Sequence, residues 1–168
     1  ITMIDFSPER LLRCANTPDT LIHSKRLKSL PHHGESSIHA YDQHEHQISV
    51  LEVACGTGPG LGYLSRIARK LVAGDISDEI LNIARSHYKE RIDIRQFDAS
   101  HMPFSNQIFD VVIIFEALYY LPDVEKFMKE CKRVLHPDGI LLIVTANKDL
   151  YDFHRSPYSY VYYGVVEL

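Results

Sequence analysis

From Gln47 onward, short apolar runs alternate with segments in which apolar residues recur at helical spacing. The apolar runs predict five strands, at residues 48–53, 70–76, 92–97, 110–115 and 140–145. Nearly continuous apolar strands separated by helices are typical of a parallel sheet that is covered on both faces. Right-handed crossovers place the carboxyl ends of all such strands at one edge. We therefore expect an α/β fold with its functional loops at that edge.

The segments between these strands carry helix signals. Ser77 and Asp123 are N-cap residue types that precede amphipathic stretches. The predicted helices span residues 61–70, 78–88 and 124–135, and a turn at residues 136–139 leads into the fifth strand.

The two ends of the chain differ in character from this core of residues 47–147. Ser7 and Pro8 predict the start of a short helix over residues 8–15. A second amphipathic helix is expected over residues 16–30, and a polar, histidine-rich segment fills residues 31–47. The tail at residues 148–168 is rich in tyrosine, and residues 158–168 predict the start of a further helix. We expect one domain over residues 1–168, with a helical cap or lid at residues 1–46.

Composition narrows the classes of function. The 168 residues fit one domain, and a net charge of −4 argues against a nucleic-acid backbone as the main partner, because that needs clustered Lys and Arg. The longest apolar stretches have the length of strands, so we expect no membrane-spanning helix. Charged residues near the N-terminus argue against a signal peptide. The three scattered cysteines are expected to be reduced structural thiols in a cytoplasmic protein.

The first apolar run of the core leads directly into a glycine loop, with Gly56, Gly58 and Gly60 at alternate positions. Glycine is used where a chain turns sharply with positive φ or touches a ligand. A loop of this kind at the end of a strand is where open α/β sheets bind cofactors. Pro59 removes an amide N–H that could face a phosphate, which counts against a nicotinamide-dependent dehydrogenase.

Three acidic residues lie at or near the ends of three successive predicted strands. Glu52 stands just before the glycine loop, Asp75 ends the second strand and Asp98 follows the third. An acid about 20 residues beyond the start of a dinucleotide-type loop accepts hydrogen bonds from ribose hydroxyls, and Asp98 is placed to accept one from an adenine amine. Alone, Asp75 is equally a helix-terminal acid and Asp98 a loop acid. Their joint position favours a nucleoside-containing cofactor.

With these features the sequence resembles the class I S-adenosylmethionine-dependent methyltransferases of the small-molecule type. The resemblance spans about residues 47–147 and rests on residues 51–58 with Gly60, residues 74–77, residues 98–99 with 102–104, residues 109–112 through 115–118, and residues 133–139. It implies a Rossmann-like doubly wound sheet with strand order 3-2-1-4-5. It also implies that the antiparallel C-terminal hairpin of the family is missing here.

The resemblance assigns S-adenosylmethionine to residues at the strand ends: Glu52, Ala54, Gly56, Thr57, Gly58, Asp75, Ile76, Asp98, Ala99 and Phe115. Glu52 and the glycine loop would hold the methionine part, Asp75 the ribose, and Asp98 with Ala99 the adenine. Phe115 and Glu116 would line the site beside the methyl group. Ala54 stands where the family often has glycine, and its methyl group is tolerated if φ is negative.

Methyl transfer from a sulfonium is an in-line displacement, so the protein mainly aligns the acceptor with the methyl carbon and the sulfur. A general base helps only if the acceptor must lose a proton, and the candidates are His101 and Glu116. His101 is also explained as a solvated loop residue, and Glu116 as a cofactor-side or structural residue. His136 lies away from the site edge. The histidines between residues 32 and 46 have no consistent ligand spacing, so we expect no metal site.

The exit of the fourth strand lacks the Asn/Asp-Pro-Pro-Tyr/Phe motif of enzymes that methylate amino groups of nucleic acids. This favours a small molecule with an O, N or C acceptor atom as the partner, rather than a nucleic acid or a membrane. Without the hairpin, the fifth strand is expected to be an exposed edge that the Tyr-rich tail or a second copy in a homodimer covers. The alternative function is a non-catalytic S-adenosylmethionine-binding module that regulates or scaffolds a partner.

Overall fold

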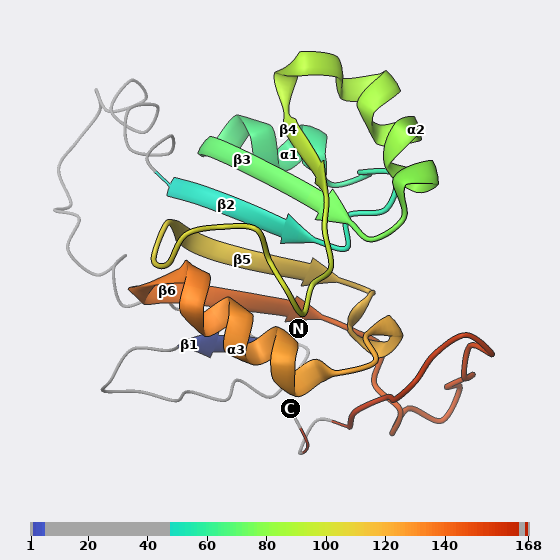
Figure 1. Ribbon diagram of the computed structural model, residues 1–168. Helices are drawn as coiled ribbons and strands as arrows, with labels where there is room; N and C mark the ends of the chain where they lie inside the picture. The colour runs from blue at the N-terminus through green and yellow to red at the C-terminus, as the bar shows by residue number, and fades with distance from the viewer. Residues whose placement is uncertain (1, 6–47, 165–166, 168) are drawn as a thin grey trace, which may run out of the picture.

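A computed structural model describes residues 2–5, 48–164 and 167, which form one sheet with helices on both faces (Figure 1). The strand order is β1-β6-β5-β2-β3-β4. The strands are β1 (Thr2–Asp5), β2 (Ile48–Val53), β3 (Ala68–Asp75), β4 (Asp93–Gln96), β5 (Phe109–Phe115) and β6 (Leu135–Val144). Neighbours among β2 to β6 run parallel. The predicted order 3-2-1-4-5 of the five parallel strands is therefore confirmed.

Helices cover the two faces of the sheet in separate layers. The described ones are α1 (Leu61–Ile67), α2 (Asp78–Tyr88) and α3 (Val124–Val134), with the 3-10 turns η3 (Lys89–Arg91) and η4 (Leu118–Tyr120). Leu61 of α1 and Leu81 of α2 share a buried cluster with Val50 of β2. Phe127 of α3 shares another with Leu51. Because successive strand residues face opposite sides, Val50 and Leu51 divide the core into two layers.

None of these described helices is both long enough and apolar enough to span a membrane.

The N-cap signals of the two longer helices are confirmed. The Ser77 side chain accepts a hydrogen bond from the Ile80 amide, and Asp123 accepts one from the Lys126 amide. The helix predicted over residues 61–70 is shorter than expected and ends at Ile67. It stops there because Ala68 already pairs with Ile48 of β2, so the next residues belong to a strand.

The turn predicted at residues 136–139 lies inside β6 rather than before it. Leu135 pairs with Phe109 and Ile140 pairs with Val111, so four residues of β6 stand opposite a single residue of β5. A Cβ at Gly139 would lie 2.9 Å from the His136 carbonyl oxygen, which explains why glycine ends this tight excursion. The boundary was wrong because the chain pairs with β5 both before and after the turn.

The outer edge of β6 is paired with β1, which corrects the expectation that the fifth parallel strand is exposed. β1 runs antiparallel to β6, with Thr2 opposite Ile143 and Asp5 opposite Ile140. The first residues of the predicted cap are therefore a strand of the sheet. The homodimer was predicted to form through this edge of β6, and β1 occupies that edge. The helices predicted over residues 8–30 and the polar segment that follows them lie outside the described residues.

The Tyr-rich tail follows β6 and lies at the carboxyl end of the sheet beside η4 (red in Figure 1). The helix expected from Tyr158 is wrong for residues 158–164, which form turns and one bridge between Asn147 and Tyr163. Arg155 donates hydrogen bonds to the carbonyl oxygens of Ser159 and Tyr160 at 3.1 and 2.9 Å. These carbonyl groups are thus bonded to a side chain instead of to a following turn of helix.

Candidate functional site

The loop between β2 and α1 is held in a conformation that glycine favours. Gly56 and Gly58 have φ values of +56° and +77°. The Cys55 amide donates to the Gly74 carbonyl oxygen at 3.0 Å, which ties the loop to β3. A Cβ at Gly56 would meet nothing within 4 Å, whereas one at Gly58 would lie 2.7 Å from Leu61 Cδ1. Gly56 therefore borders open space, and Gly58 is glycine because the α1 side chain leaves no room.

Ala54 departs from its expected conformation. Its φ is +56°, so the condition of negative φ under which a methyl group was expected to be tolerated is not met. A left-handed conformation costs an L-residue about 1 kcal/mol relative to the right-handed one. Ala54 directly follows β2 and directly precedes the bond from Cys55 to Gly74. The loop thus begins with a strained residue that the surrounding hydrogen bonds hold in place.

Glu52 is a buried acid next to the glycine loop. Its residue is 5% exposed, and its Oε2 has no hydrogen-bond partner among the residues that the structure describes. A Cβ at Gly60 would lie 3.7 Å from each carboxylate oxygen, so glycine leaves space beside this carboxylate. Burial raises the pKa of Glu52 to about 7, because the charged form is desolvated. An acid without a donor in this position is typical of a binding site.

Asp75 lies at the end of β3 and connects two loops. Its Oδ2 accepts a hydrogen bond from the Gly56 amide and its Oδ1 accepts one from the Ser77 amide, both at 3.0 Å. A carboxylate has about four lone-pair positions, so two remain for further donors. The next residue, Ile76, is 67% exposed, and its carbonyl oxygen accepts from Gln96 Nε2 at 2.9 Å. A carboxylate and an apolar side chain therefore stand together at this strand end.

Asp98 follows β4 and closes a compact turn. Its Oδ1 accepts from the Ser100 amide and hydroxyl at 2.8 and 2.7 Å, and its carbonyl oxygen accepts from the His101 amide at 2.9 Å. The two bonds from Ser100 lower the pKa of the Asp98 carboxyl group, with the Ser100 amide as the main cause. Ala99 is buried inside the turn. The Phe97 amide donates to the Asp75 carbonyl oxygen at 3.1 Å, which joins this turn to β3.

Glu116 lies at the exit of β5, next to the exposed Phe115. Its φ is +51°, and its amide donates to the Val144 carbonyl oxygen at 2.7 Å. The Tyr119 hydroxyl donates to Glu116 Oε2 at 3.2 Å. Burial and the charge of Glu116 raise the pKa of Tyr119, so its hydroxyl stays a donor. The Tyr119 ring stacks on Tyr162 of the tail with ring centroids 4.6 Å apart.

A model of the methyltransferase domain family matches residues 51–143, which is more than half of the chain. The chain belongs to the class I S-adenosylmethionine-dependent methyltransferase family. The match begins in β2 and ends in β6, so it covers all five parallel strands and the loops at their carboxyl ends.

Named relatives of this methyltransferase domain cover the same part of the chain. A probable S-adenosylmethionine-dependent methyltransferase of Mycolicibacterium smegmatis is 34% identical over 99 residues, 59% of this chain and 38% of the relative. The ubiquinone biosynthesis O-methyltransferase of Rhizobium etli is 29% identical over 106 residues, 61% of this chain and 43% of the relative. The chain thus spans about two fifths of the length of these curated relatives.

A solved structure shows the same fold. The crystal structure of an S-adenosylmethionine-dependent methyltransferase from Aquifex aeolicus superposes with a TM-score of 0.62 at 24% identity, over 70% of this chain and 66% of that chain.

The methyltransferase core brings most of the predicted site residues to one edge of the sheet. Glu52, the glycine loop and Asp75 are linked by hydrogen bonds or direct proximity, and the Asp98 turn is joined to them through Phe97. The two candidate bases lie in separate groups. His101 is 3.1 Å from the Ser100 hydroxyl through Nδ1, with its side chain 75% exposed, whereas Glu116 pairs with Tyr119.

Two further predictions concern metals and thiols. No group of three or more His, Cys, Asp and Glu residues that could hold a metal occurs within residues 2–5, 48–164 and 167. The histidines between residues 32 and 46 lie outside that part of the chain, as does Cys14. Cys55 and Cys131 are buried free thiols, and burial raises the pKa of both.

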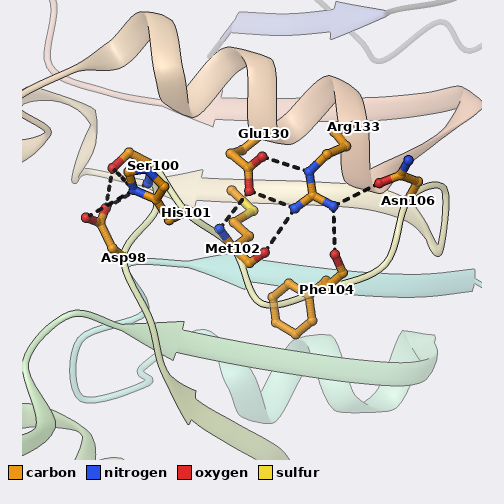
Figure 2. Close-up of polar contacts among 8 residues, drawn as sticks. All are labelled: Asp98, Ser100, His101, Met102, Phe104, Asn106, Glu130 and Arg133. Carbon is orange, nitrogen blue, oxygen red and sulfur yellow. Dashed lines mark hydrogen bonds and ion pairs between the residues drawn. The ribbon is translucent and has the colours of Figure 1, made fainter.

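Several contacts of the methyltransferase site were not predicted from the sequence. The Tyr88 hydroxyl donates to the Gly58 carbonyl oxygen at 2.6 Å and so supports the glycine loop from the end of α2. Arg133 and Glu130 of α3 bond to the loop that follows Asp98 (Figure 2). Arg133 belongs to a segment that carried the family resemblance, but its residue type alone gave no partner. Tyr88 and Tyr119 had no signal in the sequence, because both act through contacts of side chains.

Proposed function

We propose that this chain binds S-adenosylmethionine at the carboxyl edge of the sheet and transfers its methyl group to an O, N or C atom of a small molecule. One observation carries the proposal: at the ends of three adjacent strands, the carboxylates of Glu52, Asp75 and Asp98 keep acceptor capacity that the described protein groups do not use. S-adenosylmethionine carries an ammonium group, a ribose diol and an adenine amine, which are donors for three such acceptors.

The residues present fit this cofactor. The open space at Gly56 allows a ligand to approach the loop backbone closely. Glu52 lacks a donor within the described residues, and a cationic group of the methionine part would stabilise its charged form. Ile76 and Phe115 present exposed apolar side chains at the ends of β3 and β5. These two side chains offer contact surfaces for the adenosine and for the region of the methyl group.

When bound, the cofactor supplies a methyl group on a cationic sulfur, which keeps the C–S electron pair when the acceptor takes the methyl group. Glu52, Asp75 and Asp98 would hold the cofactor at three points and so would restrict its orientation. Fixed alignment of two reactants contributes about 7–11 kcal/mol to lowering the barrier in well-oriented systems. Glu116 accepts the proton where the acceptor is a hydroxyl or an ammonium group, and Tyr119 orients the Glu116 carboxylate through its hydrogen bond.

The acceptor is proposed to be small on two grounds. The relative from Rhizobium etli is named an O-methyltransferase of ubiquinone biosynthesis, which supports a small molecule with an oxygen acceptor. The net charge of −4 also disfavours a polyanionic acceptor. The cytoplasmic location and the homodimer stay predictions, and so does the lid for residues 6–46, which lie outside the described residues.

The test is calorimetric binding of S-adenosylhomocysteine to the wild-type chain and to Asp75→Ala and Asp98→Ala. Asp78→Ala is the matched control, because Asp78 is an exposed acid on α2 that pairs with Arg85. We expect binding with a dissociation constant on the order of micromolar, about tenfold weaker in each site variant and unchanged in the control. A folded wild-type chain that does not bind would refute the proposal.

A second step separates the two functions that the sequence left open. Transfer from labelled S-adenosylmethionine to a panel of phenols, carboxylates and amines is compared between the wild-type chain and Glu116→Gln. We expect turnover in the wild type and a loss of about 100-fold in the variant with unchanged S-adenosylhomocysteine binding. Binding without any transfer across the panel would favour the non-catalytic module.

A further inference from the structure

Arg133 on α3 uses every N–H of its guanidinium group (Figure 2). Its Nε donates to Glu130 Oε1 and its Nη2 donates to Glu130 Oε2, both at 2.7 Å. Nη2 also donates to the Met102 carbonyl oxygen at 2.9 Å, and Nη1 donates to the Phe104 carbonyl oxygen at 2.7 Å and to Asn106 Oδ1 at 3.0 Å. Since an arginine has five N–H donors, none is left over. Three of these five N–H groups donate to the loop between β4 and β5.

Glu130 binds the same loop from the other side of the ion pair. Its Oε2 accepts a hydrogen bond from the Met102 amide at 2.7 Å. The N–H and C=O groups of Met102 are therefore both bonded to side chains of α3. The side chains of Arg133 and Glu130 are 31% and 18% exposed, so solvent screens this pair less than a fully exposed one.

Met102 is the residue that directly follows the Asp98 turn. The turn itself is closed by the bonds from Ser100 and His101 to Asp98, so it moves as one piece. It is attached at its start through Phe97, whose amide bonds to β3, and at its end through Met102. The first attachment is backbone to backbone, while the second depends on two side chains of α3. Without those side chains, the polar ties from Met102 to α3 are gone, and the end of the turn is held only by the core packing of Met102 and Ala99 and by the bond from the Phe104 amide to the Met102 carbonyl oxygen.

We propose that Arg133 and Glu130 are positioning residues for cofactor binding, which hold Asp98 and Ala99 where the adenine part of S-adenosylmethionine meets them. The proposal rests on the adenine role of Asp98 in the proposed function. Arg133 and Glu130 extend from α3, the helix that packs on β6, and they act on the cofactor only through the loop backbone.

The first measurement compares S-adenosylhomocysteine affinity in Arg133→Met, Arg133→Lys and Lys129→Met. Lys129 is the matched control: it forms an ion pair with Glu125 at 2.7 Å on the same helix, and both side chains are exposed. We expect Arg133→Met to weaken binding about tenfold and Lys129→Met to change it by less than about twofold. Arg133→Lys should not restore affinity, because an ammonium group lacks the planar fork that reaches Glu130 and two carbonyl groups together.

The second measurement is a double-mutant cycle between Arg133 and Asp98. If Arg133 had a purely structural role, the two substitutions would show no coupling in binding affinity. Arg133→Met is measured again in the Asp98→Ala background. If Arg133 acts by placing Asp98, its loss costs no more than about twofold there. The same factor in both backgrounds, with folded proteins, would overturn the proposal, and so would an unchanged affinity in Arg133→Met alone.

The cycle also separates this proposal from the one on which it rests. If Asp98→Ala by itself leaves affinity unchanged, the adenine role of Asp98 fails and the positioning role fails with it. If Asp98→Ala weakens binding and the coupling is absent, only the positioning role fails. Should Arg133→Met not fold, Glu130→Gln goes through the same cycle, because it keeps the side-chain volume but removes the charge and one of the two acceptor oxygens that Arg133 and the Met102 amide share.

Discussion

Two regions meet at the carboxyl edge of this sheet, and they are built in different ways. The cofactor region (Glu52, the loop of residues 54–60 and Asp75) is held by backbone amides that bond to a carboxylate and by residues with positive φ. A second region (Glu116, Tyr119 and the tail of residues 151–164), which we propose faces the acceptor and call the acceptor region, is held in part by aromatic side chains, with Tyr119 stacked on Tyr162. The contacts of the first region thus centre on main-chain amides, whereas the second adds packing between aromatic side chains to its backbone bonds.

The difference between the two regions suits the two tasks of a methyltransferase, which are to bind the cofactor and to bind the acceptor. Every member that uses the same cofactor needs the same donors and acceptors around it, and backbone geometry supplies them independently of most side chains. Acceptors differ in shape, and a wall of aromatic side chains is changed by single substitutions. Strain is not confined to one region, because Ala54 and Glu116 both have positive φ. Each of the two is the residue that directly follows a central parallel strand.

The largest effect on stability is expected from a substitution at Gly74 of β3, which directly precedes Asp75 of the cofactor region. A Cβ there would overlap the Phe97 ring and the Arg95 carbonyl oxygen, and a backbone atom cannot move aside. We expect Gly74→Ala to lower the free energy of unfolding by about 3 kcal/mol or more, measured by denaturant titration. In the acceptor region, Gly164→Ala meets only the flexible Asp149 carboxylate, so its cost should be well below that. Equal costs would break the comparison.

The next effect comes from the charge of Glu52. Its pKa rises from the ordinary value of 4.5 to about 7 in the folded chain, so between these values the folded chain keeps a proton that the unfolded chain has lost. Stability therefore falls as pH rises through this window, and the full cost of about 3 kcal/mol is present above pH 7. We expect Glu52→Gln to stabilise the free protein at pH 8 and to leave it nearly unchanged at pH 4.5.

The measurement is the denaturation midpoint of Glu52→Gln and of the wild type at several pH values. Glu125→Gln is the control, because the Glu125 side chain is 80% exposed and should not remove the pH dependence. We also expect Glu52→Gln to weaken binding of S-adenosylhomocysteine, since its amide does not attract an ammonium group as a carboxylate does. A variant that is less stable than the wild type at pH 8 would show that Glu52 has a partner in the folded protein.

The comparison also explains how much of the molecule could be predicted. The parallel sheet and the glycine loop followed from apolar runs and glycines, because each is the direct consequence of a local physical need, whereas the strand order came from the family resemblance. The conformation or burial that these residue types favour does not depend on a partner far away in the chain. The same local rule failed at Ala54, where the surrounding hydrogen bonds hold an alanine at a φ of +56°.

What could not be predicted depends on pairs of residues far apart in the chain. The pairing of β1 with β6 joins residues 2–5 to residues 140–143, and no residue type among them specifies the partner. The contact of Arg133 with Phe104 spans 29 positions, and Tyr88 reaches Gly58 across 30. The tail was expected to be a helix from its local pattern, but Arg155 binds the carbonyl groups of residues 159 and 160.

A smaller effect is expected from Ala54→Gly in the cofactor region. Glycine adopts a φ of +56° without the steric cost that an alanine carries there, so the substitution should stabilise the fold by about 1 kcal/mol. Ala84→Gly is the opposite control, because Ala84 is buried in α2 and glycine in a helix costs about 1 kcal/mol. The two denaturation midpoints should move in opposite directions. A loss of stability in both would mean that Ala54 is not strained.

The smallest effect on stability is expected from Tyr119→Phe in the acceptor region. The variant keeps the ring that stacks on Tyr162 and removes only the hydroxyl that donates to Glu116 at 3.2 Å. We expect the free energy of unfolding to fall by about 0.5 kcal/mol and affinity for S-adenosylhomocysteine to stay constant. Turnover of an acceptor that must lose a proton should fall, because the Glu116 carboxylate is no longer oriented. Tyr162→Leu is the control, because it removes the ring stack and keeps the Tyr119 hydroxyl. A fall in turnover in Tyr119→Phe alone would assign the effect to the hydrogen bond. Equal falls in both variants would assign it to aromatic packing.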